Sequence, residues 1–480
     1  MVGARPRVVI AGASGFIGSR LIEALRPECD IIGLTRHPKA DEPGLHWRHC
    51  DLFSLLQAEQ ALAGADYAFY LVHSMMPMAR LTQGNFQDMD LILADNFARA
   101  AAHAGIRQIV YLGGIIPPSR QLSRHLRSRL EVEHTLAAHG VPVTRIRASI
   151  IIGPRGSSFQ IIEKLVRRLP VLLCPLWTRS KTQPIALDDV LQILKQVLGQ
   201  PEHFNQAYDV GGPDVVSYVE LMRATARALG KRRWILPVPF ISPALSRLWV
   251  SLIASAPREL VMPLIESLKD PMVAGDLRLQ QALDLPGLPL PAALKQAINQ
   301  QQQFRPSLPP RAIRHRGPYT QSLQFSDGIR HAAAKDVRSV QRLPLPPQRN
   351  AIWVAEKYTI WLPRFLKPWM RVEVDGARVI HFYLLGLPWP LLELSYAESR
   401  SSPDRALFYI TGGLLARTDT GLRGRLEFRE VLGGNCVLAA IHDFTPRLPW
   451  FIYNRSQALV HLWVMHAFGR YLRSLDVRPF

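Results

Sequence analysis

The chain has 480 residues, of which 48% are hydrophobic, and it carries a formal net charge of +20 with a pI of about 10.3. This length exceeds one ordinary domain, so we expect two or three. The positive charge favours anionic partners such as nucleotides, acidic lipid headgroups or nucleic acid, but the sequence contains neither zinc-finger spacing nor a basic heptad region, so we expect no specific nucleic-acid binding.

The four cysteines, Cys29, Cys50, Cys174 and Cys436, are far apart and form no C-x-x-C pair. We therefore expect neither a metal site nor a disulfide framework, and a reducing, cytoplasmic compartment fits best. The amino end runs directly into an apolar strand, which predicts no signal peptide. Residues 234–257 are apolar but interrupted by one arginine and four prolines. We favour packing on the protein for this segment over a position on a membrane surface.

Strand and helix signals alternate over roughly the first 200 residues. The predicted strands are Val8–Ala11, Asp30–Thr35, Tyr67–Val72, Arg107–Leu112 and Val143–Ile152, and the predicted helices end at Leu25 or span Asn85–His103 and Ser123–His139. Strands that alternate with helices predict a parallel sheet covered on both faces. The expected fold class is thus α/β, with a doubly wound parallel Rossmann sheet whose ligand lies beyond the carboxyl ends of the strands.

A glycine-rich turn joins the first strand to the first helix. Its sequence, GASGFIG, predicts a dinucleotide site, because glycine permits the tight turn, the approach of the backbone to a diphosphate and the packing of the helix on its strand. The alternative is an ordinary strand–helix turn. The predicted cofactor-binding residues of the turn are Gly12, Ala13, Ser14, Gly15, Phe16, Ile17 and Gly18.

The end of the second predicted strand bears on the choice of cofactor. An NAD site places an acidic residue there for the ribose hydroxyls, but this chain has Thr35, Arg36 and His37. Because a planar guanidinium suits a 2′-phosphate, Arg36 favours NADP over NAD. The alternative is that Arg36 is a solvated surface residue.

After about residue 155, strand and helix signals no longer alternate regularly. We assign residues 1–300 to an NAD(P)-binding Rossmann domain with a substrate-side lobe. Residues 301–350 are rich in Gln, Pro and Arg, with nine Lys/Arg against two Asp, and are expected to be a basic linker. Residues 351–480 contain three strand candidates, a Gly433–Gly434–Asn435 turn and a closing helix at about 455–475, which we expect to be buried. These features predict an α+β domain, with a helix-grip cup as one arrangement.

The motifs of the first 200 residues resemble the short-chain dehydrogenase/reductase superfamily in its extended or atypical branch. Besides the glycine turn, His49–Leu52 resembles the "GD(L/V)" element and Gln183–Val190 the "I-x-V-x-D-V" stretch of that branch. The chain is also similar to a bacterial subgroup of NAD(P)-binding Rossmann proteins with a C-terminal domain of unknown function, and more distantly to the nucleotide-binding accessory subunit of respiratory complex I. The resemblance implies further cofactor contacts at Asp51, Leu52, Leu71, Val72 and His73.

Active members of this superfamily use a Ser and a Tyr-x-x-x-Lys pair on one helix. Here Gly113 and Gly114 stand at the expected Ser position, while His125 and Arg129 hold the Tyr and Lys positions. His125 could transfer a proton, but a neighbouring cation disfavours the imidazolium that must donate. His125 and Arg129 are the catalytic candidates, the alternative being a polar helix face. His73 is another donor candidate.

Three other charged groups admit a chemical interpretation. Asp188–Asp189 could be an acid/base pair, but helix capping is the safer interpretation. His442–Asp443 could be a His–carboxylate dyad, but no nucleophile or metal spacing accompanies it. The basic cluster at 164–168 is interpreted as a solvated edge, with contact to an acidic membrane surface as the alternative.

Two functions from different classes follow. The first is an oxidoreductase that passes hydride between NADPH and a hydrophobic carbonyl or quinone-like acceptor. The second is a non-catalytic NADP-binding sensor or assembly factor, which the absent Ser and Tyr favour. A weaker third idea is that the C-terminal cup carries a lipid or another hydrophobic small molecule and that the nucleotide regulates it. The expected location is cytoplasmic, with peripheral contact at the inner membrane as an option.

Overall fold

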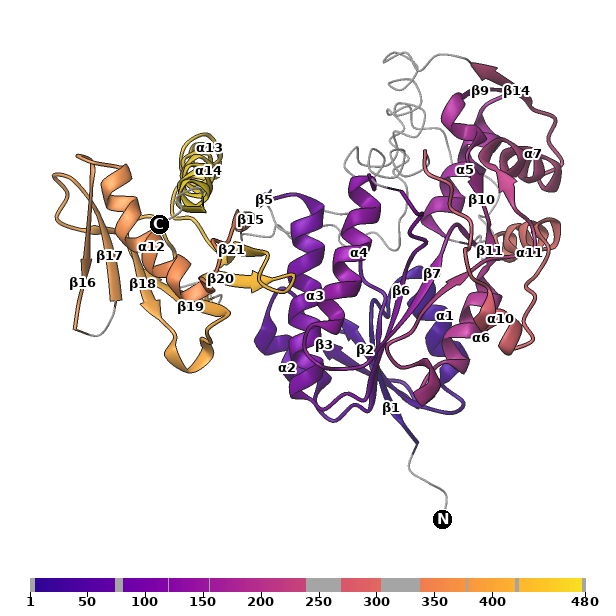
Figure 1. Ribbon diagram of the computed structural model, residues 1–480, viewed down its shortest axis with the longest axis horizontal. Helices are drawn as coiled ribbons and strands as arrows, with labels where there is room; N and C mark the ends of the chain where they lie inside the picture. The colour runs from indigo at the N-terminus through magenta and orange to yellow at the C-terminus, as the bar shows by residue number, and fades with distance from the viewer. Residues whose placement is uncertain are drawn as a thin grey trace, which may run out of the picture. The chain divides into compact units, whose positions relative to one another are not determined.

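A computed structural model describes residues 5–73, 81–119, 121–154, 156–238, 269–303, 337–376, 379–418 and 423–476 (Figure 1). The chain forms two compact units. Unit 1 comprises Met1–Met76 and Asn96–Gly328, and unit 2 comprises Pro77–Asp95 and Ile329–Phe480. The second unit is therefore built from two separate stretches of sequence.

The described part of unit 1 is organised around a parallel sheet of seven strands in the order β12-β7-β6-β4-β1-β2-β3. The strands are β1 (Arg7–Ala11), β2 (Asp30–Thr35), β3 (Leu45–His49), β4 (Tyr67–Tyr70), β6 (Gln108–Gly114), β7 (Val143–Ala148) and β12 (Ala207–Val210). The chain order reverses between β1 and β4, which makes this the switch point where a doubly wound sheet binds its ligand.

Helices cover both faces of this sheet. On one face, α1 (Phe16–Leu25) and α6 (Leu187–Gln196) share a core with apolar side chains of β1, β2, β6 and β7. On the other face lie α2 (Leu55–Leu62), α3 (Phe86–His103) and α4 (Arg124–Ala137) (Figure 1). The apolar residues of β1 from Val8 to Ala11 have no exposed surface. The doubly wound α/β fold expected from the alternating pattern is confirmed.

The substrate-side lobe of unit 1 has its own core, which α5 (Ser157–Arg168), α7 (Tyr218–Ala228) and α11 (Leu290–Gln303) share. Short strand pairs connect these helices: β8 (Ile151–Ile152) with β11 (Ile185–Ala186), β9 (Val171–Pro175) with β14 (Trp234–Val238), and β10 (Lys181–Thr182) with β13 (Val216–Ser217). The short helices are η1 (Leu176–Arg179), η2 (Pro201–His203) and α10 (Arg278–Ala282). The predicted strand Val143–Ile152 is thus divided between β7 in the main sheet and β8 in this lobe.

Unit 2 contains a largely antiparallel sheet in the order β16-β17-β18-β19-β20-β21-β15-β5. Its strands are β5 (Leu81–Gln83), β15 (Val337–Pro344), β16 (Met370–Val374), β17 (Val379–Leu384), β18 (Pro390–Tyr396), β19 (Arg405–Gly412), β20 (Arg425–Val431) and β21 (Cys436–Phe444). The helices α12 (Ala351–Phe365), α13 (Trp450–Arg455) and α14 (Gln457–Asp476) and the short η3 (Glu398–Arg400) complete it. Side chains of α12 and α14 share one core with the sheet, so the expected α+β class is confirmed.

Two expectations about the second half of the chain need correction, and one about residues 234–257 is largely untested. The range 301–350, expected to be a linker, contains β15, which pairs with β21 and β5 because its Val337, Val340 and Leu343 are buried. The closing helix is not fully buried, since α14 exposes about half of the Leu459 and Trp463 side chains. Most of the apolar segment 234–257 lies outside the described residues, apart from β14.

Candidate functional site

The glycine turn after β1 has a geometry that larger residues would not fit. Gly12 has a φ of +87°, and its carbonyl accepts a hydrogen bond from the Gly15 N–H at 2.9 Å. A Cβ atom on Gly12 would lie 2.9 Å from the carbonyl oxygen of Leu71, and one on Gly18 would lie 2.2 Å from the carbonyl oxygen of Gly12. The bare backbone therefore holds the turn close to both β4 and α1.

The amino end of α1 is suited to an anion. Its N-cap is Gly15, and among the described residues no side chain caps the helix and no acid occupies its first turn. The first amides of a helix need an acceptor, and the helix dipole favours a negative one. The turn and the helix end together fit a dinucleotide diphosphate.

The turn lies at the switch point of the sheet. The Leu71 N–H, just past β4, donates to the Ala11 carbonyl at the end of β1 at 3.0 Å. Leu71, Val72 and His73 thus follow the strand beside the glycine turn, as the resemblance implied for cofactor contacts. These three residues are partly buried.

Two cations follow β2. Arg36 is exposed directly after the strand, and Lys39 donates from Nζ to Ser14 Oγ of the glycine turn at 3.0 Å. The Lys39 ammonium also lies 4.2 Å from the ring centroid of Trp47 on β3. Sequence reasoning overlooked Lys39, although a second cation in the loop that carries Arg36 was a usable signal.

Asp51 and Leu52 shape the turn between β3 and α2. The Asp51 N–H donates to Gln57 Oε1 at 2.9 Å, and its Oδ1 accepts from the Phe53 N–H at 3.1 Å. The Leu52 carbonyl accepts from Asn96 Nδ2 at 2.8 Å, and Asn96 is fully buried. Asn96 therefore holds this turn in place, a role that its position inside a helical pattern did not reveal.

Gly113, one of the two glycines at the position expected for the Ser, leaves no room for a side chain. A Cβ there would lie 2.6 Å from the ring of Tyr111, which is fully buried on β6. At Gly114, the nearest atoms to a Cβ belong to Leu126 and Met272 at 3.9 Å. The strand end thus has room for a side chain at the second glycine and none at the first.

His125 lies in the first turn of α4, whose N-cap Ser123 accepts from the Leu126 N–H at 3.3 Å. Arg129 follows one turn later, and its carbonyl lies 3.5 Å from the Tyr111 hydroxyl. The rings of His125 and His73 are in contact, with centroids 5.1 Å apart and planes inclined by 58°. The fold therefore brings together the two histidines that sequence reasoning named separately.

The Phe16 side chain has a packing role. Its ring occupies the space that a Cβ on Gly153 or Gly156 would need, with atoms 2.6 and 3.1 Å from those positions. Any dinucleotide contact from Phe16 would therefore come from its backbone, at the start of α1.

Asp188 and Asp189 do not cap α6, whose N-cap Ala186 has no side-chain bond. Instead Asp189 Oδ2 accepts from the Leu288 N–H at 2.7 Å, and Asp188 accepts from Gln296 of α11. The pKa of Asp189 is raised, mainly by burial and less by the nearby Asp188, and the Leu288 hydrogen bond opposes this rise without cancelling it. The expected capping role is wrong, because these carboxylates bind the later segment that contains Leu288 and Gln296.

His442 and Asp443 do not form a dyad with each other. His442 Nε2 lies 3.1 Å from Glu427 Oε1, whereas Asp443 pairs with Arg425 at 2.9 Å. Because neighbouring residues of a strand point to opposite faces, His442 turns inward and Asp443 does not.

The basic cluster on α5 is partly occupied by internal contacts. Arg167 Nε pairs with the buried Glu163 at 2.6 Å. Desolvation, followed by the repulsion of Arg168, lowers the pKa of Lys164. The solvated-edge interpretation therefore holds only in part.

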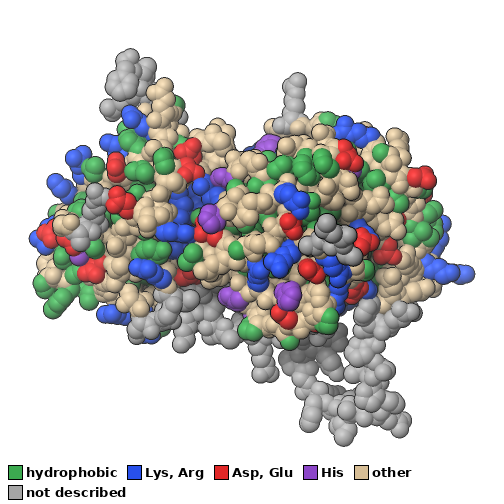
Figure 2. All heavy atoms as spheres, turned by 90° about the horizontal axis from the view of Figure 1, so that it is seen from below, with side chains coloured by type: hydrophobic (Ala, Val, Ile, Leu, Met, Phe, Trp, Pro, Cys, Tyr) green, Lys and Arg blue, Asp and Glu red, His purple; other side chains and the backbone are tan. Residues whose placement is uncertain are grey.

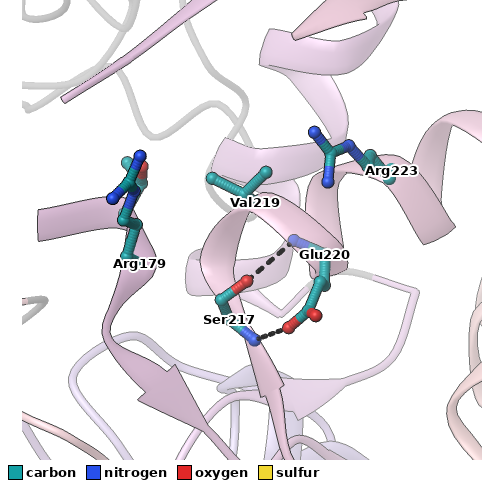
Figure 3. Close-up of a pocket in the computed structure, with 6 residues that line it drawn as sticks. Arg179, Ser217, Val219, Glu220 and Arg223 are labelled. Carbon is teal, nitrogen blue, oxygen red and sulfur yellow. Dashed lines mark hydrogen bonds between the residues drawn. The ribbon is translucent and has the colours of Figure 1, made fainter. Parts of the chain in front are cut away.

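A cavity of about 250 Å³ lies in the substrate-side lobe, between η1 and the start of α7 (Figure 3). Its lining residues are Thr178, Arg179, Ser217, Val219, Glu220 and Arg223. Ser217 and Glu220 form a capping box, and the hydrogen bonds from Ser217, with Lys181 nearby, lower the pKa of Glu220 to about 2. None of the site residues predicted from the sequence lines this cavity.

The strand order, the switch point and the glycine turn define a doubly wound unit of the Rossmann type, the class of fold that binds dinucleotides. Residues 8–211 match the NAD dependent epimerase/dehydratase family. Among the described residues, no helix is long and apolar enough to cross a membrane.

Two curated proteins and one solved structure show what the chain is similar to. It is 31% identical over 142 residues to the auxiliary protein GraX of Staphylococcus aureus, a match that covers 29% of this chain and only 43% of GraX. It is 23% identical over 257 residues to UDP-glucose 4-epimerase of Vibrio cholerae, covering 48% of this chain and 78% of that protein. The structure of Citrobacter sp. triphenylmethane reductase complexed with NADP(H) is 19% identical, with a TM-score of 0.48, over 60% of this chain and 99% of that chain.

Proposed function

We propose that the protein is an NADP-dependent oxidoreductase that passes hydride between NADPH and a hydrophobic carbonyl or quinone-like acceptor. The observation that carries this proposal is the contact of His73 with His125 beyond the carboxyl end of β4, next to the glycine turn. When bound, the nicotinamide supplies the hydride, so the chain has to position its ligands and manage one proton.

His125 is the proposed proton donor and His73 its positioning partner. A histidine can release a proton from one ring nitrogen and recover it near neutral pH, and a second imidazole beside it can orient the first or take part in the relay. Arg129, one helical turn after His125, provides positive charge for ribose hydroxyls or phosphate and holds no transferable proton.

Arg36 and Lys39 support NADP as the cofactor. Both cations follow β2, and Lys39 contacts Ser14 in the glycine turn. An Asp in place of Arg36 should shift the ratio of NADPH to NADH affinity toward NADH, measured by calorimetric titration, and Lys39→Ala should weaken NADPH binding more than NADH binding. An unchanged ratio in both variants would rule out the 2′-phosphate assignment.

Turnover is tested by NADPH oxidation with panels of carbonyl and quinone acceptors. His125→Ala should lose most of the turnover while keeping its affinity for NADPH, and His73→Ala should change the pH profile of the rate. His134→Ala is the matched control, because His134 is exposed on the same helix. Equal turnover in all three variants would contradict the assignment of His125 as the proton donor.

A non-catalytic NADP-binding sensor or assembly factor is the second candidate. It is favoured by Gly113 and Gly114 at the Ser position, and by the similarity of 142 residues to a protein named as auxiliary. Tight NADPH binding without turnover of any acceptor would select this function. No heat with either coenzyme, oxidised or reduced, would exclude both candidates.

A further inference from the structure

Unit 2 exposes a group of large apolar side chains at the end of the β16–β17 pair. Trp369, Leu385 and Trp389 expose 66%, 63% and 62% of their surface. They belong to one structural feature, because the Leu385 N–H donates to the Trp369 carbonyl at 2.7 Å and Pro390, the residue after Trp389, pairs with Tyr383 of β17. We call this feature, with Leu384, the tryptophan tip.

A second group of exposed apolar side chains lies on α14. Leu459, Val460 and Trp463 each expose half or more of their surface, along one side of the helix. The Trp463 ring lies 4.8 Å from the ring of Phe365 at the end of α12, the helix that leads into the tryptophan tip. Single exposed apolar residues are ordinary, but groups of large exposed apolar side chains mark an interaction surface.

The charges that flank this surface are mainly positive. Arg364 in the last turn of α12 and Lys367 just before the tip are exposed, and neither has an ion-pair partner among the described residues. Arg371, at the start of β16, pairs with Glu373 at 3.2 Å. In Figure 2, hydrophobic side chains lie among charged side chains of both signs, with many Lys and Arg, over the part of the face that unit 2 forms, at the left.

We infer that the tryptophan tip and the exposed side of α14 dock unit 2 on an anionic lipid bilayer. Tryptophan rings and leucines favour the boundary between headgroups and acyl chains, while arginine and lysine beside them attract acidic headgroups. The chain's net charge of +20 acts in the same direction. The inference does not depend on the proposed function, since no residue of the glycine turn or of the His73–His125 pair takes part in it.

The test is flotation of the full chain with vesicles of phosphatidylcholine alone and vesicles that also contain about 30% phosphatidylglycerol, from about 50 to about 500 mM NaCl. Binding should require the anionic lipid and weaken as salt rises. Trp369→Ser with Trp389→Ser should lower the partition coefficient at least about tenfold. Arg364→Glu with Lys367→Glu should lower it chiefly at low salt.

Trp234→Ser is the matched control, because Trp234 is 73% exposed on β14 in unit 1, and it should partition like the unaltered chain. The unfolding midpoint should stay the same in every variant, since the altered side chains are exposed. The inference is overturned if the chain does not float with anionic vesicles at low salt, or if the double tryptophan variant binds as well as the control. It is also overturned if light scattering shows a dimer that this variant abolishes while no vesicle binding occurs.

Discussion

Gly12 and Gly105 both hold a positive φ, of +87° and +70°, but only Gly12 is crowded by other atoms. Alanine at Gly105 should cost about 1 kcal/mol for its backbone conformation alone. Alanine at Gly12 adds a clash with the Leu71 carbonyl, so it should also displace the turn that faces the dinucleotide. We expect Gly12→Ala to reduce NADPH affinity at least about tenfold by calorimetry and Gly105→Ala to leave it unchanged. Equal affinity in the two variants would argue against the turn as the diphosphate site.

The two glycines at the end of β6 provide a second contrast between single residues. Gly113→Ser pushes a Cβ into the buried ring of Tyr111, so it should destabilise unit 1 by about 1–3 kcal/mol. Gly114→Ser meets only ordinary contacts and should cost less than about 1 kcal/mol. Thermal unfolding of both variants checks this difference, and equal losses would contradict the packing argument.

At the scale of elements, a buried charge network fixes the sheet of unit 2. Glu427 on β20 accepts from Arg429 at 2.9 Å and Arg405 at 3.0 Å, while Arg429 also reaches Asp95 of α3 at 2.9 Å. Burial alone raises the pKa of Glu427, but Arg429 and Arg405 outweigh it and hold that pKa well below the usual range. If one member of such a buried network is removed, its partners are left as buried charges without compensation.

Glu427→Gln should therefore cost about 3–5 kcal/mol, because it leaves two buried guanidiniums with too little negative charge. Urea unfolding followed by tryptophan fluorescence measures the loss. The control is Glu23→Gln on α1, whose partner Arg20 forms an exposed pair at 2.8 Å, and which should cost less than about 1 kcal/mol. If the two losses were similar, the network would contribute no more than a surface pair.

The elements that sequence reasoning located are those with a strong local pattern. β2 has the predicted bounds, Asp30–Thr35, because its apolar run is buried on both faces. β3, with the sequence LHWRH, was overlooked because an edge strand has polar residues on both sides. β15 was overlooked because its Arg and Gln residues resemble a linker, although Val337, Val340 and Leu343 are buried.

The same distinction applies to the site. The glycine turn is encoded within seven adjacent residues, so local reasoning found it. The contact of His73 with His125 depends on how α4 packs against β6, the strand next to β4, and the role of Asn96 depends on a hydrogen bond to a distant turn. Such contacts arise from tertiary packing and leave no local signal.

At the scale of the whole molecule, stability should fall in mild acid. Burial lowers the pKa of His461 on α14 from 6.5 to about 4 and lowers that of His442 as well. Below pH 6.5 the unfolded chain binds protons that the folded chain does not bind. The stabilisation of the folded state that comes from this pKa difference is therefore complete above pH 6.5 and is lost as the pH falls toward about 4.

His461→Gln should make this decline less steep, because glutamine does not bind a proton in this pH range. Glutamine can still reach Ser339, and His442 should maintain the rest of the decline. Unfolding midpoints measured from about pH 4 to about pH 7 check the slope. The exposed His466 on the same helix gives the control variant, His466→Gln, which should follow the unaltered chain. A slope that His461→Gln leaves intact would assign the acid sensitivity to other groups.

Because β5 and the start of α3 belong to unit 2, the two units are interleaved along the chain. A protein truncated to residues 329–480 would lack Asp88 and Asp95, the buried acids that pair with Arg342 and Arg429. No single cut of the gene can therefore release unit 2 intact. A graft of residues 329–480 onto another scaffold has to include residues 77–95, as an added segment or through circular permutation.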